Sequence, residues 1–277
     1  MKPERTIGRV TLVIAVFCVT AQVKAEKRGN EHLEIWKDPA FQKQFMGSYG
    51  MKADIEPRVT SVEKEQMEEI MPLMDSEEGM IRAAAMLQKL AKPSASAIFD
   101  FTLANLYFQM DKLEEAAQWY ENAIEKYPSF QRAHKNLGLV HVRGEDPGKA
   151  AAPLTEALEL GANDGLTYGL LGFSNLASER YIAAEGAYRQ AIMLQPDTVD
   201  WKLGLARCLF KQKRYEAAAS LCGELIDGSP AKSEFWILQA NAYLGMKQPL
   251  KAAENYEYLD LMGKATANSL NLLGDIY

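Results

Sequence analysis

A group of small and aromatic residues recurs along this sequence at a fixed interval of 34 residues. The smallest member of each copy is an alanine, found at Ala116, Ala150, Ala184, Ala218 and Ala252. Thirteen residues before each alanine, a leucine or glutamine is followed by glycine or alanine. Each copy therefore predicts two helices. Because one pair of helices cannot bury its apolar face alone, the copies are expected to stack on one another.

Prolines mark the ends of the predicted helices. Pro147 and Pro249 fall where the second helix of a unit begins, a place that tolerates proline because the first-turn N–H groups have no helical partner. Pro153 instead falls inside a predicted second helix. That helix is therefore expected to kink at Pro153 or to leave a carbonyl group without a partner.

The pattern resembles that of the tetratricopeptide repeat family, in which W-x2-L-G-x2-Y is followed by A-x3-F, A and P within a unit of about 34 residues. The resemblance implies an all-α fold, a right-handed superhelical solenoid of antiparallel helix pairs. The predicted array covers residues 97–277, with units at 97–130, 131–164, 165–198, 199–232 and 233–266 and a partial unit at 267–277.

The first 25 residues are typical of a secretory signal peptide. Three basic residues precede an apolar run from Val10 to Thr20, which is shorter than the roughly 20 residues of a membrane-spanning helix. We therefore expect cleavage after Ala25 and a periplasmic or secreted protein.

Two further segments precede the predicted array. Residues 26–61 mix charged residues, glycine and proline without a sustained period, and are predicted to form a linker. Residues 62–96 contain two helical patterns, interrupted by Pro72, with apolar residues on one face of the second. This segment is predicted to be an N-terminal helical cap or degenerate repeat that covers the first unit.

Composition and motifs argue against several classes of function. A net charge of −6 disfavours nucleic acid as a partner. No catalytic or phosphate-binding motif is found, so the sequence predicts a protein that is not an enzyme and uses no cofactor or small-molecule substrate. His134 and His141 lie on one predicted helix without a third ligand nearby, which favours packing over metal binding. Cys208 and Cys222 are predicted to be buried free thiols, because the helix register places them beyond the roughly 7 Å Cα range of a disulfide.

The resemblance places the candidate binding site on the first helix of each unit, because in tetratricopeptide arrays these helices line a concave groove that holds peptides or partner helices. The groove positions of this sequence are mainly apolar, aromatic and basic. The candidate groove residues are Phe101, Asn105, Phe108, Arg132, Lys135, Leu139, Phe173, Leu203, Arg207, Phe210, Lys211 and Asn241. Such a groove suits a ligand with spaced apolar anchors and some acidic residues. Leucine and phenylalanine at these positions also pack against neighbouring helices, and that interpretation stays open.

The two-carboxylate clamp of the chaperone-binding family members is incomplete in this sequence. Asn105 and Asn136 match two of its positions, but Phe101 replaces the lysine, and Leu166 and Leu170 replace the two basic residues. Capture of an acidic C-terminal peptide through such a clamp is therefore not expected.

The sequence thus predicts a non-enzymatic protein–protein interaction scaffold in the bacterial cell envelope. Residues 136–140, 168–172 and 238–243 are similar to exported repeat proteins that accompany TonB-type energy-transduction systems, which makes TonB, ExbB and ExbD candidate partners. The partial last unit is a second candidate docking surface. The alternative is that the array forms the accessory half of a longer exported enzyme whose catalytic domain lies beyond Tyr277.

Overall fold

The computed structural model describes residues 56–144 and 146–277. The predicted signal peptide and most of the predicted linker therefore lie outside the described residues. Within the described ranges the secondary structure is entirely helical, and no strand is formed. The prediction of an all-α fold is confirmed.

The described chain begins with two helices and a tight turn between them. Helix α3 (Ser61–Ile70) starts with a capping box, in which Thr60 and Glu63 exchange hydrogen bonds. The short 3-10 helix η2 (Met71–Asp75) contains Pro72, which ends the first α-helical pattern as expected. Helix α4 (Glu77–Leu90) follows and packs against the first helix of the repeats.

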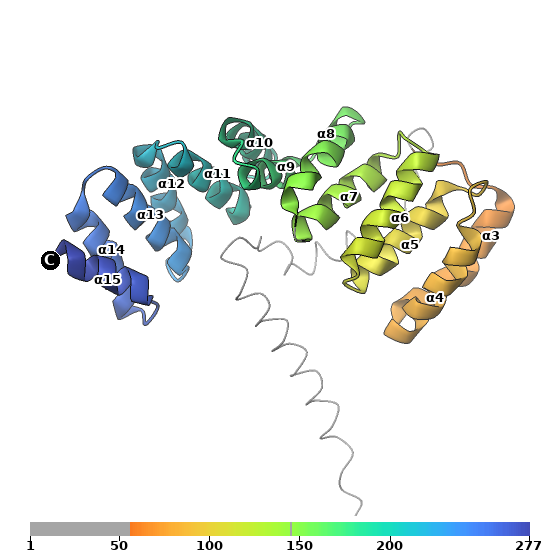
Figure 1. The fold of residues 1–277 in the computed structure, drawn as a ribbon, viewed down its shortest axis with the longest axis horizontal. Coiled ribbons are helices and arrows are strands. Elements are labelled where there is room, and N and C mark those ends of the chain that lie inside the picture. The colour runs from red at the N-terminus through yellow and green to blue at the C-terminus, as the bar shows by residue number, and fades with distance from the viewer. Residues whose placement is uncertain (1–55, 145) are drawn as a thin grey trace, which may run out of the picture. The chain divides into compact units, whose positions relative to one another are not determined.

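The repeats form antiparallel helix pairs that pack against one another in chain order (Figure 1). The first helices of the successive units are α5 (Ala97–Gln109), α7 (Gln131–Arg143), α9 (Gly165–Ala177), α11 (Val199–Lys211) and α13 (Ser233–Gly245). The second helices are α6 (Leu113–Lys126), η3 (Pro147–Ala150) with α8 (Ala151–Glu159), α10 (Tyr181–Leu194), α12 (Tyr215–Gly228) and α14 (Pro249–Leu261). One further helix, α15 (Ala267–Ile276), packs on α14.

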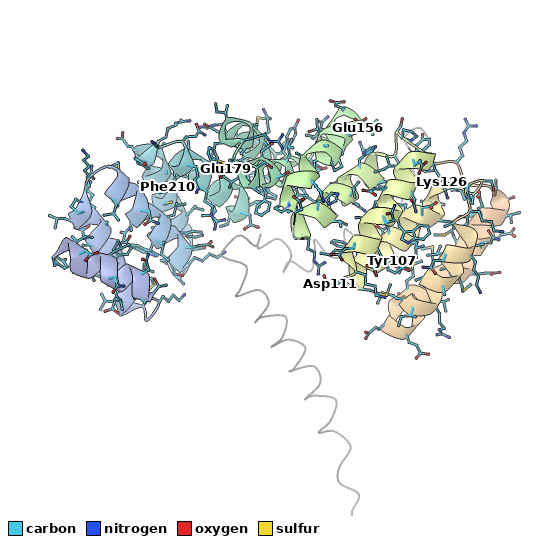
Figure 2. The ribbon with its side chains drawn as sticks, viewed as in Figure 1. Tyr107, Asp111, Lys126, Glu156, Glu179 and Phe210 are labelled. Atoms are coloured by element: carbon cyan, nitrogen blue, oxygen red, sulfur yellow. The ribbon has the colours of Figure 1, made fainter. Side chains whose placement is uncertain are left out.

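The turns between the two helices of a unit repeat the same backbone conformation. Asp111, Glu179, Lys213 and Lys247 each have a φ close to +60°, a left-handed conformation that non-glycine residues seldom adopt. Asp111 and Glu179, labelled in Figure 2, follow α5 and α9 in the chain. The backbone therefore keeps the 34-residue period where the side chains differ.

Small residues allow the helices to approach closely. The side chains of Tyr120, Tyr188 and Tyr256 are buried between helices, with at most 1% of each exposed. A Cβ atom added to Gly138 would lie 2.4 Å from Leu154 Cγ, and one added to Gly204 would lie 2.2 Å from Tyr188 Cζ. Glycine at these two positions is thus required by the packing of a neighbouring helix, α8 for Gly138 and α10 for Gly204, rather than by backbone conformation.

We expected Pro153 to kink the second helix of its unit, but the structure shows a change of helix type before Pro153 instead. The second helix of this unit begins as a 3-10 turn at Pro147, and its α-helical part starts only at Ala151. Pro153 is therefore the third residue of α8, within the first turn, where its missing N–H has no partner inside α8. The structure accommodates the proline by starting the α-helix later.

Helix α15 presents part of its surface to solvent. Leu270 is 44% exposed and Tyr277 is 77% exposed. The Tyr277 hydroxyl donates a hydrogen bond to Glu257 Oε1 at 2.7 Å, which ties the last residue to α14. Among the described helices, none combines the length and the apolar character needed to cross a membrane.

Candidate partner-binding face

The first helices of the units form one continuous layer. Asn136 of helix α7 donates a hydrogen bond to Asn105 of α5, and α7 contacts α9, α9 contacts α11, and α11 contacts α13. We call the surface formed by the candidate groove residues of these helices the A-face. The candidate residues divide into two sets according to their burial.

Six candidate residues are buried and belong chiefly to the core. None of them is more than 8% exposed. They are Phe101, Asn105, Phe108, Leu139, Phe173 and Leu203. Leu203, for example, packs with Leu225, Ile226 and Phe235. The apolar residues of this set therefore pack between helices, which was the alternative to direct ligand contact.

The other six candidate residues keep part of their side-chain surface exposed to solvent. Four of them are cations, three of which are held by carboxylates of the same chain. This set comprises Arg132, Lys135, Arg207, Phe210, Lys211 and Asn241, of which Lys211 is exposed and the others are half-buried. The predicted basic character of the A-face is therefore present but partly neutralised within the protein.

Arg132 is the most enclosed of these cations. Its Nε lies 2.6 Å from Glu56 Oε1, and its Nη2 donates a hydrogen bond to Glu56 Oε2 at 2.7 Å. The guanidinium carbon lies 5.0 Å from the centre of the Phe101 ring and 5.9 Å from that of Phe130. A planar guanidinium that faces aromatic rings, forms an ion pair with a carboxylate and donates a hydrogen bond to it is a strong, directional anion site.

The remaining cation pairs join successive first helices. Lys135 Nζ of α7 lies 2.8 Å from Asp164 Oδ2, and Asp164 also caps α9 by accepting from the Thr167 N–H. Arg207 Nη2 of α11 lies 3.3 Å from Glu234 Oε2 of α13. Both pairs are partly exposed to solvent, so each contributes little to stability, about 0–1 kcal/mol.

The asparagines form a buried polar network rather than a ligand clamp. The Tyr120 hydroxyl donates a hydrogen bond to Asn105 Oδ1, and Asn136 Nδ2 donates to the same oxygen at 3.1 Å. In the fifth unit the Tyr256 hydroxyl donates to Asn241 Oδ1 at 3.2 Å. Asn105 and Asn241 therefore hold the second helix of their own unit, whereas Asn136 joins α7 to the preceding unit.

Two residues of the site, Glu56 and Phe130, were not predicted from the sequence. Glu56 lies in the predicted linker, 76 residues from Arg132, and no local pattern indicates that the two side chains meet. In the sequence, Phe130 is simply the last residue of the first unit. In the structure it is fully buried, and its ring centre lies 4.8 Å from that of Phe101. Only the folded chain brings these residues to the start of α7.

The cysteines and histidines occupy packed positions. Cys208 and Cys222 are both buried free thiols, as predicted. Burial raises the pKa of each thiol to about 12, which makes the reactive thiolate scarce at neutral pH. Burial likewise lowers the pKa of His141, which favours its neutral form. His134 Nε2 lies 2.8 Å from the Pro128 carbonyl oxygen.

Comparison with known proteins agrees with the repeat architecture. Two sequence models of the tetratricopeptide repeat family match the chain, at residues 101–165 and 175–242. Serine/threonine-protein phosphatase 5 of Rattus norvegicus is 33% identical over 119 residues, or 42% of this chain. The match covers 24% of the phosphatase, so the chain spans about a quarter of that relative's length. Protein SULFUR DEFICIENCY-INDUCED 1 of Arabidopsis thaliana is 23% identical over 172 residues, covering 61% of this chain and 52% of that protein.

Solved structures show the same fold. A tetratricopeptide repeat protein from Parabacteroides merdae aligns with a TM-score of 0.59 at 18% identity, covering 77% of this chain and 84% of the other. YrrB, described as a TPR protein with an unusual peptide-binding site, aligns with a TM-score of 0.58 at 22% identity, covering 63% and 90%. MamA aligns with a TM-score of 0.56 at 18% identity, covering 59% and 90%.

The architecture is that of an α-helical repeat scaffold, the class in which stacked helix pairs expose an extended surface for other proteins. Within that class the chain carries tetratricopeptide repeats at residues 101–165 and 175–242, and such repeats imply protein or peptide partners.

Proposed function

We propose that this protein is a non-enzymatic scaffold of the bacterial cell envelope that binds a peptide or partner helix on the A-face. The observation that carries the proposal is the distribution of side chains on α7 and α11. Lys135, Arg207, Phe210 and Lys211 keep exposed surface while the layer beneath them is closely packed. An aromatic ring beside long cationic side chains offers both burial and charge to a partner.

The ligand best suited to this face alternates apolar and acidic residues. Phe210 lies against Tyr215, with ring centres 5.5 Å apart, and together they form an aromatic contact surface at the end of α11. Lys211 adjoins Phe210 in sequence and is exposed. Half-buried cations steer an acidic partner and fix its register, whereas the aromatic area supplies most of the affinity.

The location in the envelope is supported by the sequence of residues 1–25, which has the form of a secretory signal peptide. A finer proposal is that the partner belongs to a TonB-type energy-transduction complex, made of TonB, ExbB and ExbD. It is supported by the similarity of residues 136–140, 168–172 and 238–243 to exported repeat proteins of such systems.

The test is a pull-down from bacterial envelope extract with two variants that each lose three cations. The first, Lys135→Ala with Arg207→Ala and Lys211→Ala, removes charge from the A-face. The second removes the same charge elsewhere, through Lys89→Ala, Arg180→Ala and Lys251→Ala, which alter exposed residues of α4, α10 and α14 or their caps.

We expect the second variant to retain the partners of the wild-type protein and the first to lose them. Equal retention by both variants would exclude the A-face as the binding surface. Mass spectrometry of the retained proteins tests the finer proposal at the same time, and absence of TonB, ExbB and ExbD from the wild-type sample would remove it. Circular dichroism should show that both variants remain fully helical, because each loses only exposed or half-buried charges.

A further inference from the structure

The carboxylate that pairs with the Arg132 guanidinium belongs to Glu56, which lies outside the repeats. Two other A-face cations pair with residues at the beginning of the next first helix: Lys135 pairs with Asp164, the N-cap of α9, and Arg207 pairs with Glu234 of α13. Glu56 instead precedes α3 and reaches Arg132 across a sequence separation of 76 residues. The carboxylate can therefore leave Arg132 without breaking the contact between two repeat helices.

The Glu56 carboxylate is enclosed at Arg132 as a bound ligand would be. The Glu56 and Arg132 side chains are only 6% and 15% exposed. Phe101 and Phe130 enclose the guanidinium and are themselves 3% and 0% exposed. A carboxylate paired with a guanidinium in such surroundings is screened little by water.

The backbone next to Glu56 is anchored. Thr60 caps α3 together with Glu63, and the Glu63 carboxylate also accepts a hydrogen bond from the Ser96 N–H at 2.8 Å. The segment is thus fixed to the start of α5 only a few residues after Glu56. Such a short tether gives Glu56 a high effective concentration at Arg132.

We infer that Arg132, Phe101 and Phe130 form a binding pocket for the carboxylate of an acidic peptide side chain, and that Glu56 occupies this pocket as a competing ligand from the same chain. A partner with a glutamate or aspartate at the matching position displaces Glu56 when it binds. The inference deepens the proposed function, on which it rests, by naming the chemistry of one partner residue and the group that opposes it.

The test uses a fluorescein-labelled peptide with the sequence of residues 53–61, which presents Glu56 in its own context. Fluorescence anisotropy measures its binding to the full chain, as wild type and as Glu56→Gln. The variant keeps the size of the side chain but removes the charge that pairs with Arg132, so residue 56 competes less with the peptide for Arg132. We expect the variant to bind at least about tenfold more tightly than the wild type, which corresponds to about 1.4 kcal/mol.

Two controls assign the effect to the pocket. Adding Arg132→Lys to the Glu56→Gln protein keeps the positive charge but removes the paired nitrogen atoms, and should return the affinity to the wild-type level or below. The peptide carrying Gln in place of Glu56 should bind weakly to every protein. Circular dichroism of the three proteins checks that their helical content is the same.

Equal affinity of the wild type and the Glu56→Gln variant for the peptide would overturn the inference. Equal binding of the Glu and Gln peptides by the variant would do the same. The outcomes remain distinct from those of the pull-down. Tight peptide binding after Glu56→Gln without any envelope partner refutes the proposed function alone, whereas partner capture without peptide binding refutes this inference alone.

Discussion

The substitution Gly204→Ala tests whether the repeat stack depends on close contact between a glycine and a tyrosine ring. A Cβ at residue 204 would lie 2.2 Å from Tyr188 Cζ and 2.5 Å from Cε1. Non-bonded carbon atoms are most stable at about 3.5–4.0 Å, so the ring or helix α11 must move by more than about 1 Å. Tyr188 is fully buried, and Gly172 and Trp201 also contact its ring, which leaves little room for that movement.

The expected magnitude follows from two opposing effects. Overpacking a closed core costs about 1–3 kcal/mol, and alanine gains about 1 kcal/mol over glycine inside a helix. Because the clash is severe and the ring enclosed, the cost should exceed the gain, and the free energy of unfolding should fall by about 1–2 kcal/mol. For a domain of this size that lowers Tm by about 2–8 °C.

The chain offers a matched control on the neighbouring helix. Gly186 of α10 is exposed, and a Cβ added there would meet no atom within 4 Å. Gly186→Ala should therefore raise stability by up to about 1 kcal/mol. Thermal and urea unfolding, followed by circular dichroism at 222 nm, should thus show opposite shifts for the same chemical change at two helical glycines.

A double-mutant cycle identifies the clashing partner. Tyr188→Leu removes the ring atoms nearest residue 204, so Gly204→Ala should cost much less in that background than in the wild type. The reasoning fails if Gly204→Ala is as stable as the wild type, or if its cost is unchanged when Tyr188 is replaced.

Two further predictions concern the turns and the thiols. Lys213 has a φ of +62° and an exposed side chain, so Lys213→Gly should relieve backbone strain and raise the urea midpoint by an amount equivalent to about 0.5–1 kcal/mol; an unchanged or lower midpoint would contradict this. Burial raises the pKa of Cys208 and Cys222 to about 12, so the folded thiols stay protonated while those of the unfolded chain ionise above about pH 8.5. Stability that is fully present below that pH should then fall as pH rises towards 12, by up to about 1.4 kcal/mol per pH unit for each thiol. Urea midpoints between pH 8 and 10.5 should show a flatter profile for the Cys208→Ala, Cys222→Ala variant, and identical slopes for the two proteins would exclude the thiols as the cause.

The repeat architecture could be predicted because the residues that define it lie close together in the chain and recur in every unit. Helix pairs interact mainly with their immediate neighbours, so each 34-residue unit carries nearly all the residues that define its own packing. The alanines at Ala116 and Ala184 and the tyrosines four residues later therefore predicted the helix pairs correctly. The buried free state of Cys208 and Cys222 followed from helix geometry alone.

The functional face could be predicted only in part. Position within the unit identified which residues lie on the first helices, but it did not separate those that are buried, such as Phe101 and Leu139, from those that keep exposed surface, such as Arg207. That difference depends on the size of side chains in neighbouring units, which a single-unit pattern does not describe. Pro153 shows the same limit, since its effect depends on where the α-helix starts.

The amino-acid pattern alone thus specifies the helices, their pairing and the order in which they stack, because these depend on contacts between residues close in the chain. The tertiary structure alone shows that Glu56 reaches Arg132 and that Asn105, Asn136 and Tyr120 share one polar network. Hydrogen bonds and ion pairs require particular atoms to meet at about 3 Å. A periodic pattern of residue types does not carry such distances when the partner lies outside the period.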